Sequence, residues 1–233
     1  MNAITRGGIE FIAVLFGLSI SLWIDNTAKE NELKIQNKKI LNRLYHNLLA
    51  DSTDGTWNFK AYERGIKGSE NVIKWCDSNP TFSSIDDSIE KDISAMMITT
   101  IFFHNEEEYI ALKNSGRTDL ITNEDLVIKL HDYYTRIGFI KTLDAFQYDF
   151  VRTKIIPFIS DYSDENLFIK GAENSVVYEN FPKINLYKMP EVKKMRFYAS
   201  NMLTWQRYTK SWYKGQVRRV TEIRKLLREE LNL

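Results

Sequence analysis

The chain has little cysteine, proline or glycine, the residues that cross-link a backbone or interrupt its helices. It contains one cysteine, Cys76, and only four prolines and ten glycines among 233 residues. A single thiol excludes an intrachain disulfide and is compatible with either side of a membrane. Because no stretch is rich in proline or glycine, we expect long helices without a flexible internal linker.

Recognisable catalytic motifs are also missing. The three histidines, His46, His104 and His131, lie in separate segments and lack zinc-motif spacing. Ser115-Gly116 lacks the preceding glycine of a nucleophile elbow, and no glycine-rich phosphate loop occurs. The segment 104–108, His-Asn-Glu-Glu-Glu, offers metal-ligand atoms, but acidic residues are more often the start of a helix. We therefore predict a protein without catalytic activity, metal or cofactor.

One long apolar run is present, from Gly7 to Ile24, with Glu10 as its one charged residue. At about 1.5 Å per helical residue it spans roughly 27 Å, close to a bilayer core of about 30 Å. A cleaved signal peptide is the alternative, but Ser19-Ile20-Ser21 and the sequence after Asn26 are poor cleavage sites. We predict a single-pass anchor over residues 1–25 in the bacterial inner membrane. Arg6 and the basic residues after Lys29 give opposing signals for orientation, which stays open.

Small residues recur every four positions in this run. Ala13, Gly17 and Ser21 would form a stripe on one helix face, with Glu10 on much the same face. Small-residue stripes let helices approach closely in lipid, so the pattern predicts a homo-oligomer through this face. Two alternatives remain: Glu10 extends to the headgroups, or a Glu10 ring marks the mouth of a pore lined by the stripe.

Further along, apolar periodicity predicts a mainly α-helical fold. A juxtamembrane helix over 26–54 should continue the anchor and stop at Asp51-Ser52-Thr53-Asp54-Gly55, since these residues favour caps and turns. A second helix is expected from Trp57 to Cys76, weakened by Gly65 and Gly68, and a third over 84–101. Together with the later segments these form a helical domain over 55–190, which includes an irregular excursion over 161–190.

A tight corner between two helices is predicted around residue 116. Gly116 should cap a helix after Leu112, and Thr122 or Asn123 should cap the next one. Leu126, Leu130 and Tyr133 or Tyr134 would form the buried face of that second helix.

Two sequence patterns in the same order resemble an uncharacterised family of bacterial single-pass membrane proteins. That family begins with an apolar helix containing Gly and Glu, and it carries a Leu-x-x-Ser-Gly-x-x-x-Leu-Ile corner before a helix ending in Tyr-Tyr. The matching residues are Gly8, Glu10, Val14, Gly17, Leu18, Leu22, Ile24, Asp25 and Asn26, then Leu112, Ser115, Gly116, Leu120, Ile121, Tyr133 and Tyr134. The resemblance implies membrane residence and a helical domain, and it implies no known activity.

The last segment, 191–233, is predicted to be one basic helix that returns alongside the juxtamembrane helix. Met195, Tyr198, Met202, Trp205 and Trp212 follow heptad-like spacing. Its basic surface comprises Arg207, Lys210, Lys214, Arg218, Arg219 and Arg224. These cations fit acidic residues of the same or a neighbouring subunit, anionic lipid, or, less well, nucleic acid with aromatic stacking.

These patterns together predict a transmembrane helix that continues into a helical bundle with a long C-terminal helix. The expected function is a self-associating interaction or assembly module with lipid and an unidentified protein as partners. An oligomeric pore is the first alternative, and a lipid- or nucleic-acid-binding module is the second.

Overall fold

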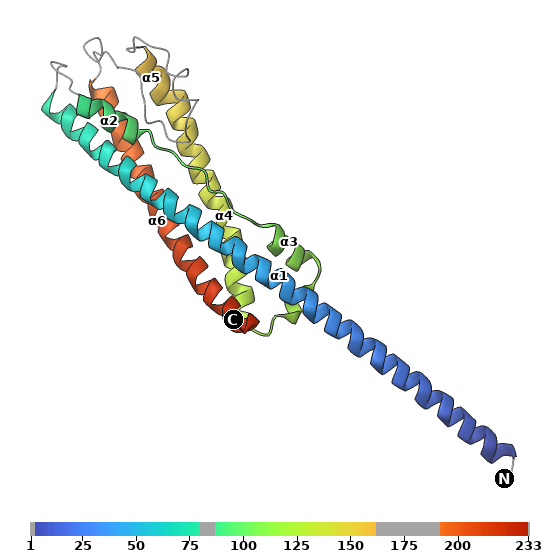
Figure 1. Cartoon of the computed structure of the whole chain (residues 1–233). Coiled ribbons are helices and arrows are strands. Elements are labelled where there is room, and N and C mark those ends of the chain that lie inside the picture. The colour runs from blue at the N-terminus through green and yellow to red at the C-terminus, as the bar shows by residue number, and fades with distance from the viewer. Residues whose placement is uncertain (1–2, 80–86, 162–191, 233) are drawn as a thin grey trace.

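The fold is mainly α-helical, as predicted, and is dominated by one exceptionally long helix. The computed structural model describes residues 3–79, 87–161 and 192–232, with side chains of residues 3–10, 87 and 88 left out. Helix α1 (Ala3–Ser78) has 76 residues and therefore extends for about 114 Å. Its first part projects alone from the bundle (Figure 1).

Three long helices form the bundle. Helix α4 (Glu124–Phe150) runs in the same direction as α1, whereas α6 (Val192–Leu231) runs antiparallel to both (Figure 1). The fourth position is filled by α2 (Asp87–Met96), an extended segment over 98–106, and α3 (Glu107–Asn114). The short helices η1 (Arg117–Leu120), η2 (Val151–Ile155) and α5 (Ile156–Ser160) complete the described chain.

On each of the three long helices, one series of buried positions alternates in steps of three and four residues. This is the heptad pattern of a left-handed bundle. The positions of this series on α1 are Leu41, Leu44, Leu48, Asp51, Gly55, Asn58, Tyr62, Gly65, Ser69, Val72 and Cys76. Those of α4 and η2 are Leu126, Leu130, Tyr133, Ile137, Ile140, Asp144, Gln147 and Val151. Those of α6 are Met195, Ala199, Met202, Gln206, Thr209, Tyr213, Gln216, Val220, Ile223 and Leu227.

The core is apolar at both ends and polar in its middle. One apolar cluster surrounds Leu44, Leu130 and Leu227 at the end nearer the projecting helix. The other surrounds Val72 and Met202 at the far end. Between them, heptad positions hold buried polar side chains of all three long helices.

The predicted helix stop at Asp51–Gly55 is wrong, because α1 continues through it. Ser52 and Thr53 lie on the outer side, and the Thr53 hydroxyl donates to the carbonyl of Leu49 within the helix. The Asp51 and Asp54 carboxylates accept hydrogen bonds from another segment instead of capping their own helix. The predicted domain boundary after residue 54 therefore falls inside one helix.

Two glycines predicted to weaken the second helix are points of close packing. A Cβ atom on Gly65 would lie 2.6 Å from Gln206 Nε2, and one on Gly68 would lie 2.7 Å from Ala95 Cβ and from α2 backbone atoms. Helix α2 can therefore lie directly against α1 because these positions lack side chains. The third predicted helix is shorter than expected, since the chain becomes extended after Met97.

The predicted corner is confirmed. Gly116 adopts the left-handed conformation with φ of 65°, which a residue without Cβ tolerates best. The Asn123 side chain accepts a hydrogen bond from Leu126 N at the start of α4. Leu126, Leu130, Tyr133 and Tyr134 are buried.

The C-terminal helix is confirmed in extent but presents a different face. Met195, Tyr198 and Met202 are buried as predicted. Beyond them the core takes Gln206, Thr209, Tyr213 and Gln216, and the two tryptophans are only partly buried. The predicted excursion over 161–190 lies outside the described residues after Asp161.

Candidate functional site

An extended segment lies where a four-helix bundle would have a helix. We call residues 98–106 the strap. An extended backbone cannot satisfy its own N–H and C=O groups, so burial requires partners from elsewhere. Those partners are polar side chains of the long helices, at or next to the buried heptad positions.

Several amides and carbonyls of the strap form hydrogen bonds with these side chains. Asp54 accepts from Phe103 N at 3.1 Å and Asp51 from Asn105 N at 3.0 Å. Carbonyl oxygens accept from the side chains of Asn58 (Ile101 O, 3.4 Å), Tyr134 (Asn105 O, 3.1 Å) and Gln206 (Ile98 O, 3.4 Å). The polar middle of the core therefore serves to hold the strap.

Asp144 is the centre of this polar layer. Its carboxylate accepts hydrogen bonds from the hydroxyls of Tyr62 (2.8 Å), Thr100 (3.4 Å) and Tyr213. Gln147 lies one helical turn further on and donates to Thr209 Oγ1 at 2.7 Å. The side chains therefore tie α1, the strap, α4 and α6 together at one level.

Burial raises the pKa of Asp144 to about 6, against the lowering effect of the hydroxyls of Tyr213, Tyr62 and Thr100. Burial also raises the pKa of Asp51, while hydrogen bonds from Tyr133 and Asn105 lower it. Both carboxylates are 3% exposed or less. A buried carboxyl group of this kind can hold a proton in the interior. The hydrogen bonds of Asp144 also join α1, the strap, α4 and α6.

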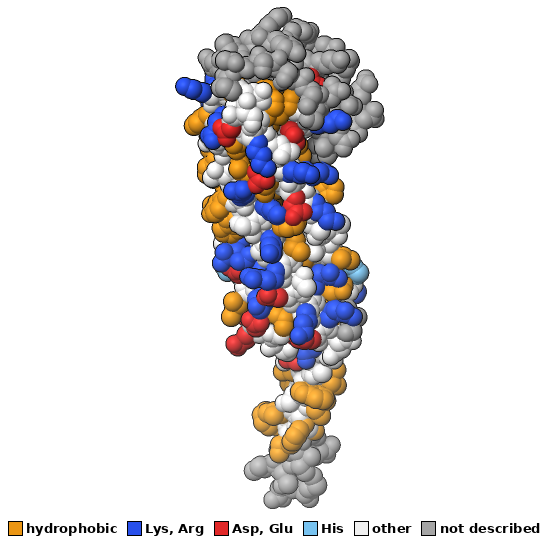
Figure 2. All heavy atoms as spheres, turned by 90° about the vertical axis from the view of Figure 1, so that its left-hand side faces the viewer, with side chains coloured by type: hydrophobic (Ala, Val, Ile, Leu, Met, Phe, Trp, Pro, Cys, Tyr) orange, Lys and Arg blue, Asp and Glu red, His pale blue; other side chains and the backbone are white. Residues whose placement is uncertain are grey.

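The basic residues of α6 face acids on neighbouring helices. Glu63 and Glu70 of α1 meet Lys210 (2.9 Å) and Arg207 (2.6 Å), and Arg196 meets Asp77 at 2.6 Å. The three acids are spaced by seven residues along α1 and therefore lie along one edge of its heptad face. Figure 2 shows Lys and Arg side chains interleaved with acidic ones over one side of the bundle.

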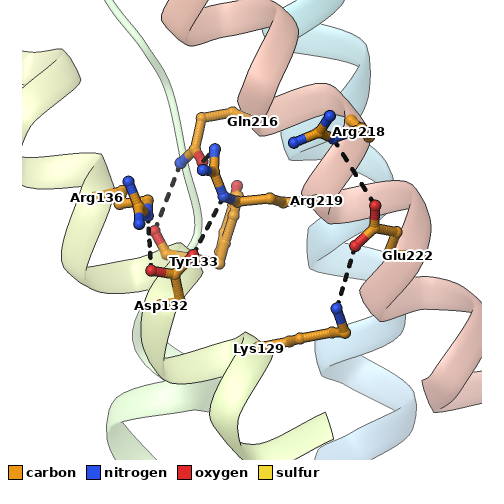
Figure 3. A network of polar contacts seen from close by, with 8 residues as sticks. All are labelled: Lys129, Asp132, Tyr133, Arg136, Gln216, Arg218, Arg219 and Glu222. Carbon is orange, nitrogen blue, oxygen red and sulfur yellow. Dashed lines mark hydrogen bonds and ion pairs between the residues drawn. The ribbon is translucent and has the colours of Figure 1, made fainter. Parts of the chain in front are cut away.

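The remaining predicted basic residues are divided among several contacts. Arg219 contacts Asp132 at 3.2 Å, and Arg218 lies 3.8 Å from Glu222, which also contacts Lys129 (Figure 3). Arg224 donates to the hydroxyl of Tyr45, with its guanidinium over the ring. Lys214 is exposed.

The opposite flank of α6 carries aromatic residues that meet those of α4. We call Phe139, Phe146, Trp205, Tyr208 and Trp212 the aromatic seam. Ring centroids lie 4.7 Å apart for Phe146–Trp205 and 4.6 Å apart for Phe139–Trp212, with Tyr208 in contact with both tryptophans. Most basic residues of this helix therefore lie on a different flank from the aromatic ones, and Arg219, on the α4 side, is held by Asp132. This arrangement argues against one mixed surface for nucleic acid.

The predicted membrane face lies on the projecting part of α1. Ala13, Gly17 and Ser21 are exposed, and nothing lies within 4 Å of a Cβ placed on Gly17. The Glu10 side chain is outside the described residues. Large apolar side chains around the stripe are exposed too, among them Phe11 (67%) and Trp23 (69%). This helix is long and apolar enough to cross a membrane.

The predicted acidic helix start is confirmed, since Glu107 and Glu108 occupy the first turn of α3. Within residues 3–79, 87–161 and 192–232 no three His, Cys, Asp or Glu side chains come together in a metal-binding group. His104 instead lies 3.3 Å from Glu106 and stacks on Phe102.

Sequence reasoning missed the polar layer and the strap. Asp144, Gln147, Thr209 and Gln216 look like surface residues when only apolar side chains are counted. The available signal is spacing: each continues the heptad series of its own helix if polar residues are admitted.

Comparisons with known proteins give no relative from which a function could be transferred. No family model, curated protein or solved structure matches this chain.

Proposed function

We propose that this chain is a single-pass membrane protein that self-associates through the face formed by Glu10, Ala13, Gly17 and Ser21. Its bundle acts as a non-catalytic interaction module beside the cell membrane. The observation that carries the proposal is the apolar surface of α1 from Phe11 to Ile24, which packs against no described part of the bundle.

Such a surface is costly in water. Each Å² of exposed apolar area forgoes about 25 cal/mol of burial, and soluble monomers rarely expose contiguous apolar patches of more than a few hundred Å². Lipid would cover the whole circumference of the helix at once. Trp23 stands at the end of the apolar run, where aromatic residues favour the interface, and the Asp25–Lys29 ion pair follows it.

The geometry of α6 argues against the lipid-binding alternative. The helix runs along α1, so its basic residues are distributed over the height of the bundle (Figure 1). Arg196, Arg207 and Lys210 also pair with α1 acids. A bundle with many intrachain ion pairs and a strap in place of a helix fits an interaction module.

Membrane flotation tests the anchor. We expect the wild-type chain to float with lipid vesicles, and the double change Leu15→Lys/Leu18→Lys to abolish flotation because charge at the bilayer centre is costly. Ile101→Lys/Phe103→Lys is the matched control, since both side chains are exposed on the bundle. A wild-type chain that stays in the soluble fraction would overturn the proposal.

A further inference from the structure

A small hollow opens at the corner formed by α3, η1 and the first turns of α4. It has a volume of about 140 Å³ and lies towards the end of the bundle from which α1 projects (Figure 1). Its apolar lining consists of Leu112, Ile121, Val127 and Leu130, and its polar lining of Tyr109, Lys113, Thr118 and His131. Acids are frequent in this part of the chain, yet none of the described ones lines the hollow.

The floor of the hollow belongs to the apolar core. Leu112, Ile121 and Leu130 are each 6% exposed or less and pack in the cluster nearer the projecting helix. The left-handed turn at Gly116 and the hydrogen bond from Ile121 N to Thr118 O (3.0 Å) fix the path of η1. Because the surrounding backbone is fixed, the hollow exists without a ligand, as most small-molecule sites do.

A tyrosine–histidine pair in the lining keeps one hydrogen-bond donor free. The Tyr109 hydroxyl and His131 Nδ1 lie 2.9 Å apart. In a neutral imidazole, either the hydroxyl donates and the His131 Nε2–H is left over, or Nδ1–H donates and the Tyr109 O–H is left over. The Tyr109 ring is also stacked on Tyr134, with centroids 4.2 Å apart. In both tautomers, therefore, a positioned pair retains one donor for a ligand.

Lys113 is the cation among the described residues that line the hollow. It is exposed, and its ammonium group forms no ion pair or hydrogen bond within the described chain. Glu108 on the same helix is paired with Arg43 at 2.7 Å instead. A cation without an acidic partner, beside an apolar hollow with a free donor, favours a ligand with a negatively charged group.

We propose that this hollow binds a small apolar carboxylate of about the size of benzoate. Its apolar part lies on the floor of Leu112, Ile121 and Leu130, and its carboxylate meets Lys113 and the free donor of the tyrosine–histidine pair. An apolar cavity of about 150 Å³ holds one benzene ring, so the volume fits a single ring and excludes a peptide or a helix. The inference goes beyond the proposed function, because it depends neither on the anchor nor on self-association.

Ligand-observed NMR with benzoate tests the site on the full-length chain in mild detergent. We expect saturable binding with a dissociation constant in the millimolar range, since the ligand is small and one side of the hollow stays open to water. Benzamide has a similar size without the charge, and benzylammonium reverses the charge, so both should bind more weakly. Absence of saturable benzoate binding, or equal binding of the three compounds, would overturn the proposal.

Filling the hollow tests its position. Val127→Phe should abolish benzoate binding, because the larger side chain extends from a half-buried wall into the space for the ring. Thr118→Leu fills the hollow from η1 and should act in the same way. Ile128→Phe is the matched control, since this side chain is 66% exposed and is not part of the lining. Circular dichroism establishes that each variant is folded, and folded filling variants that bind benzoate like the wild type would contradict the inference.

Removing the cation tests the chemistry of the ligand. Lys113→Gln should weaken benzoate binding by a factor of roughly two to five, as expected for an exposed ion pair, and should leave benzamide binding unchanged. Lys141→Gln, at an exposed lysine of α4 away from the hollow, should affect neither compound. Equal effects of the two lysine changes on benzoate would show that the charge acts over the whole surface, and this result would refute a carboxylate site at Lys113.

Discussion

Asp144 shows how one buried carboxylate can join a whole section of the bundle. It accepts hydrogen bonds from residues of α1, the strap and α6 while lying on α4. A buried polar group of this kind costs stability when a partner is lost, because the remaining groups stay desolvated. Gln147 and Gln206 likewise form hydrogen bonds between neighbouring segments in the adjacent layers of the core.

Protonation of Asp144 should stabilise the fold. Burial raises its pKa to about 6 from an ordinary value of 3.8, so the folded chain binds this proton more tightly than the unfolded chain. Relative to Asp144→Asn, the unfolding free energy of the wild type should therefore rise as the pH falls through 6 towards 4. The full difference is about 3 kcal/mol, from roughly 1.4 kcal/mol per pKa unit.

Urea unfolding of both chains at several pH values measures this difference. The other shifted acids are common to both chains, so their contributions cancel. Parallel pH dependence in the two chains would refute the assignment of the proton to Asp144.

Among the elements, α4 and α6 were predictable and the strap was not. The Asn123 cap, Gly116 and the apolar positions of α4 are local signals that the structure retains. The continuity of α1 through Asp51–Gly55 depends on the strap amides that those carboxylates accept, and a long-range partner leaves no local signal. The positions of Trp205 and Trp212 also lacked a local signal. Both were expected in the core because large apolar residues are buried more often than glutamine and threonine.

The α1–α2 contact should tolerate no side chain at Gly68. We expect Gly68→Ala to lower the unfolding free energy by about 1–3 kcal/mol, because its Cβ would meet α2 backbone atoms at 2.7 Å. Gly138→Ala is the matched control, since nothing lies within 4 Å of its added Cβ, and it should raise stability by roughly 0.5–1 kcal/mol through helix propensity. Thermal unfolding followed by circular dichroism distinguishes the two, and equal shifts would contradict close packing at Gly68.

Over the whole molecule, the stripe on the projecting helix and the core side of α1 point in different directions. From Gly17 to Leu41 a helix of about 3.6 residues per turn makes roughly six and two-thirds turns, so the membrane stripe faces about 120° away from the core side of α1. A contact through the stripe therefore does not bring the core sides of two α1 helices together.

We expect the wild-type chain in mild detergent to form an oligomer through the stripe. Gly17→Leu should give monomers, because a large side chain prevents close approach of the helices. Leu15→Ile, off the stripe, should change nothing. Native mass spectrometry gives the sizes, and a Gly17→Leu chain that assembles like the wild type would exclude the membrane stripe as an interface.

The unbroken α1 also sets a height. From Ile24 to Ser78 it rises by about 80 Å at 1.5 Å per residue, without a hinge to shorten that reach. If the apolar run lies in the bilayer, the far end of the bundle is held at a fixed distance from the membrane. Removing seven residues from the exposed part of α1 before Gln36 would bring that end roughly 10 Å closer to the membrane and would nearly preserve the direction in which the bundle faces. The shortened chain would then fail to reach a partner at the original height because of the distance alone.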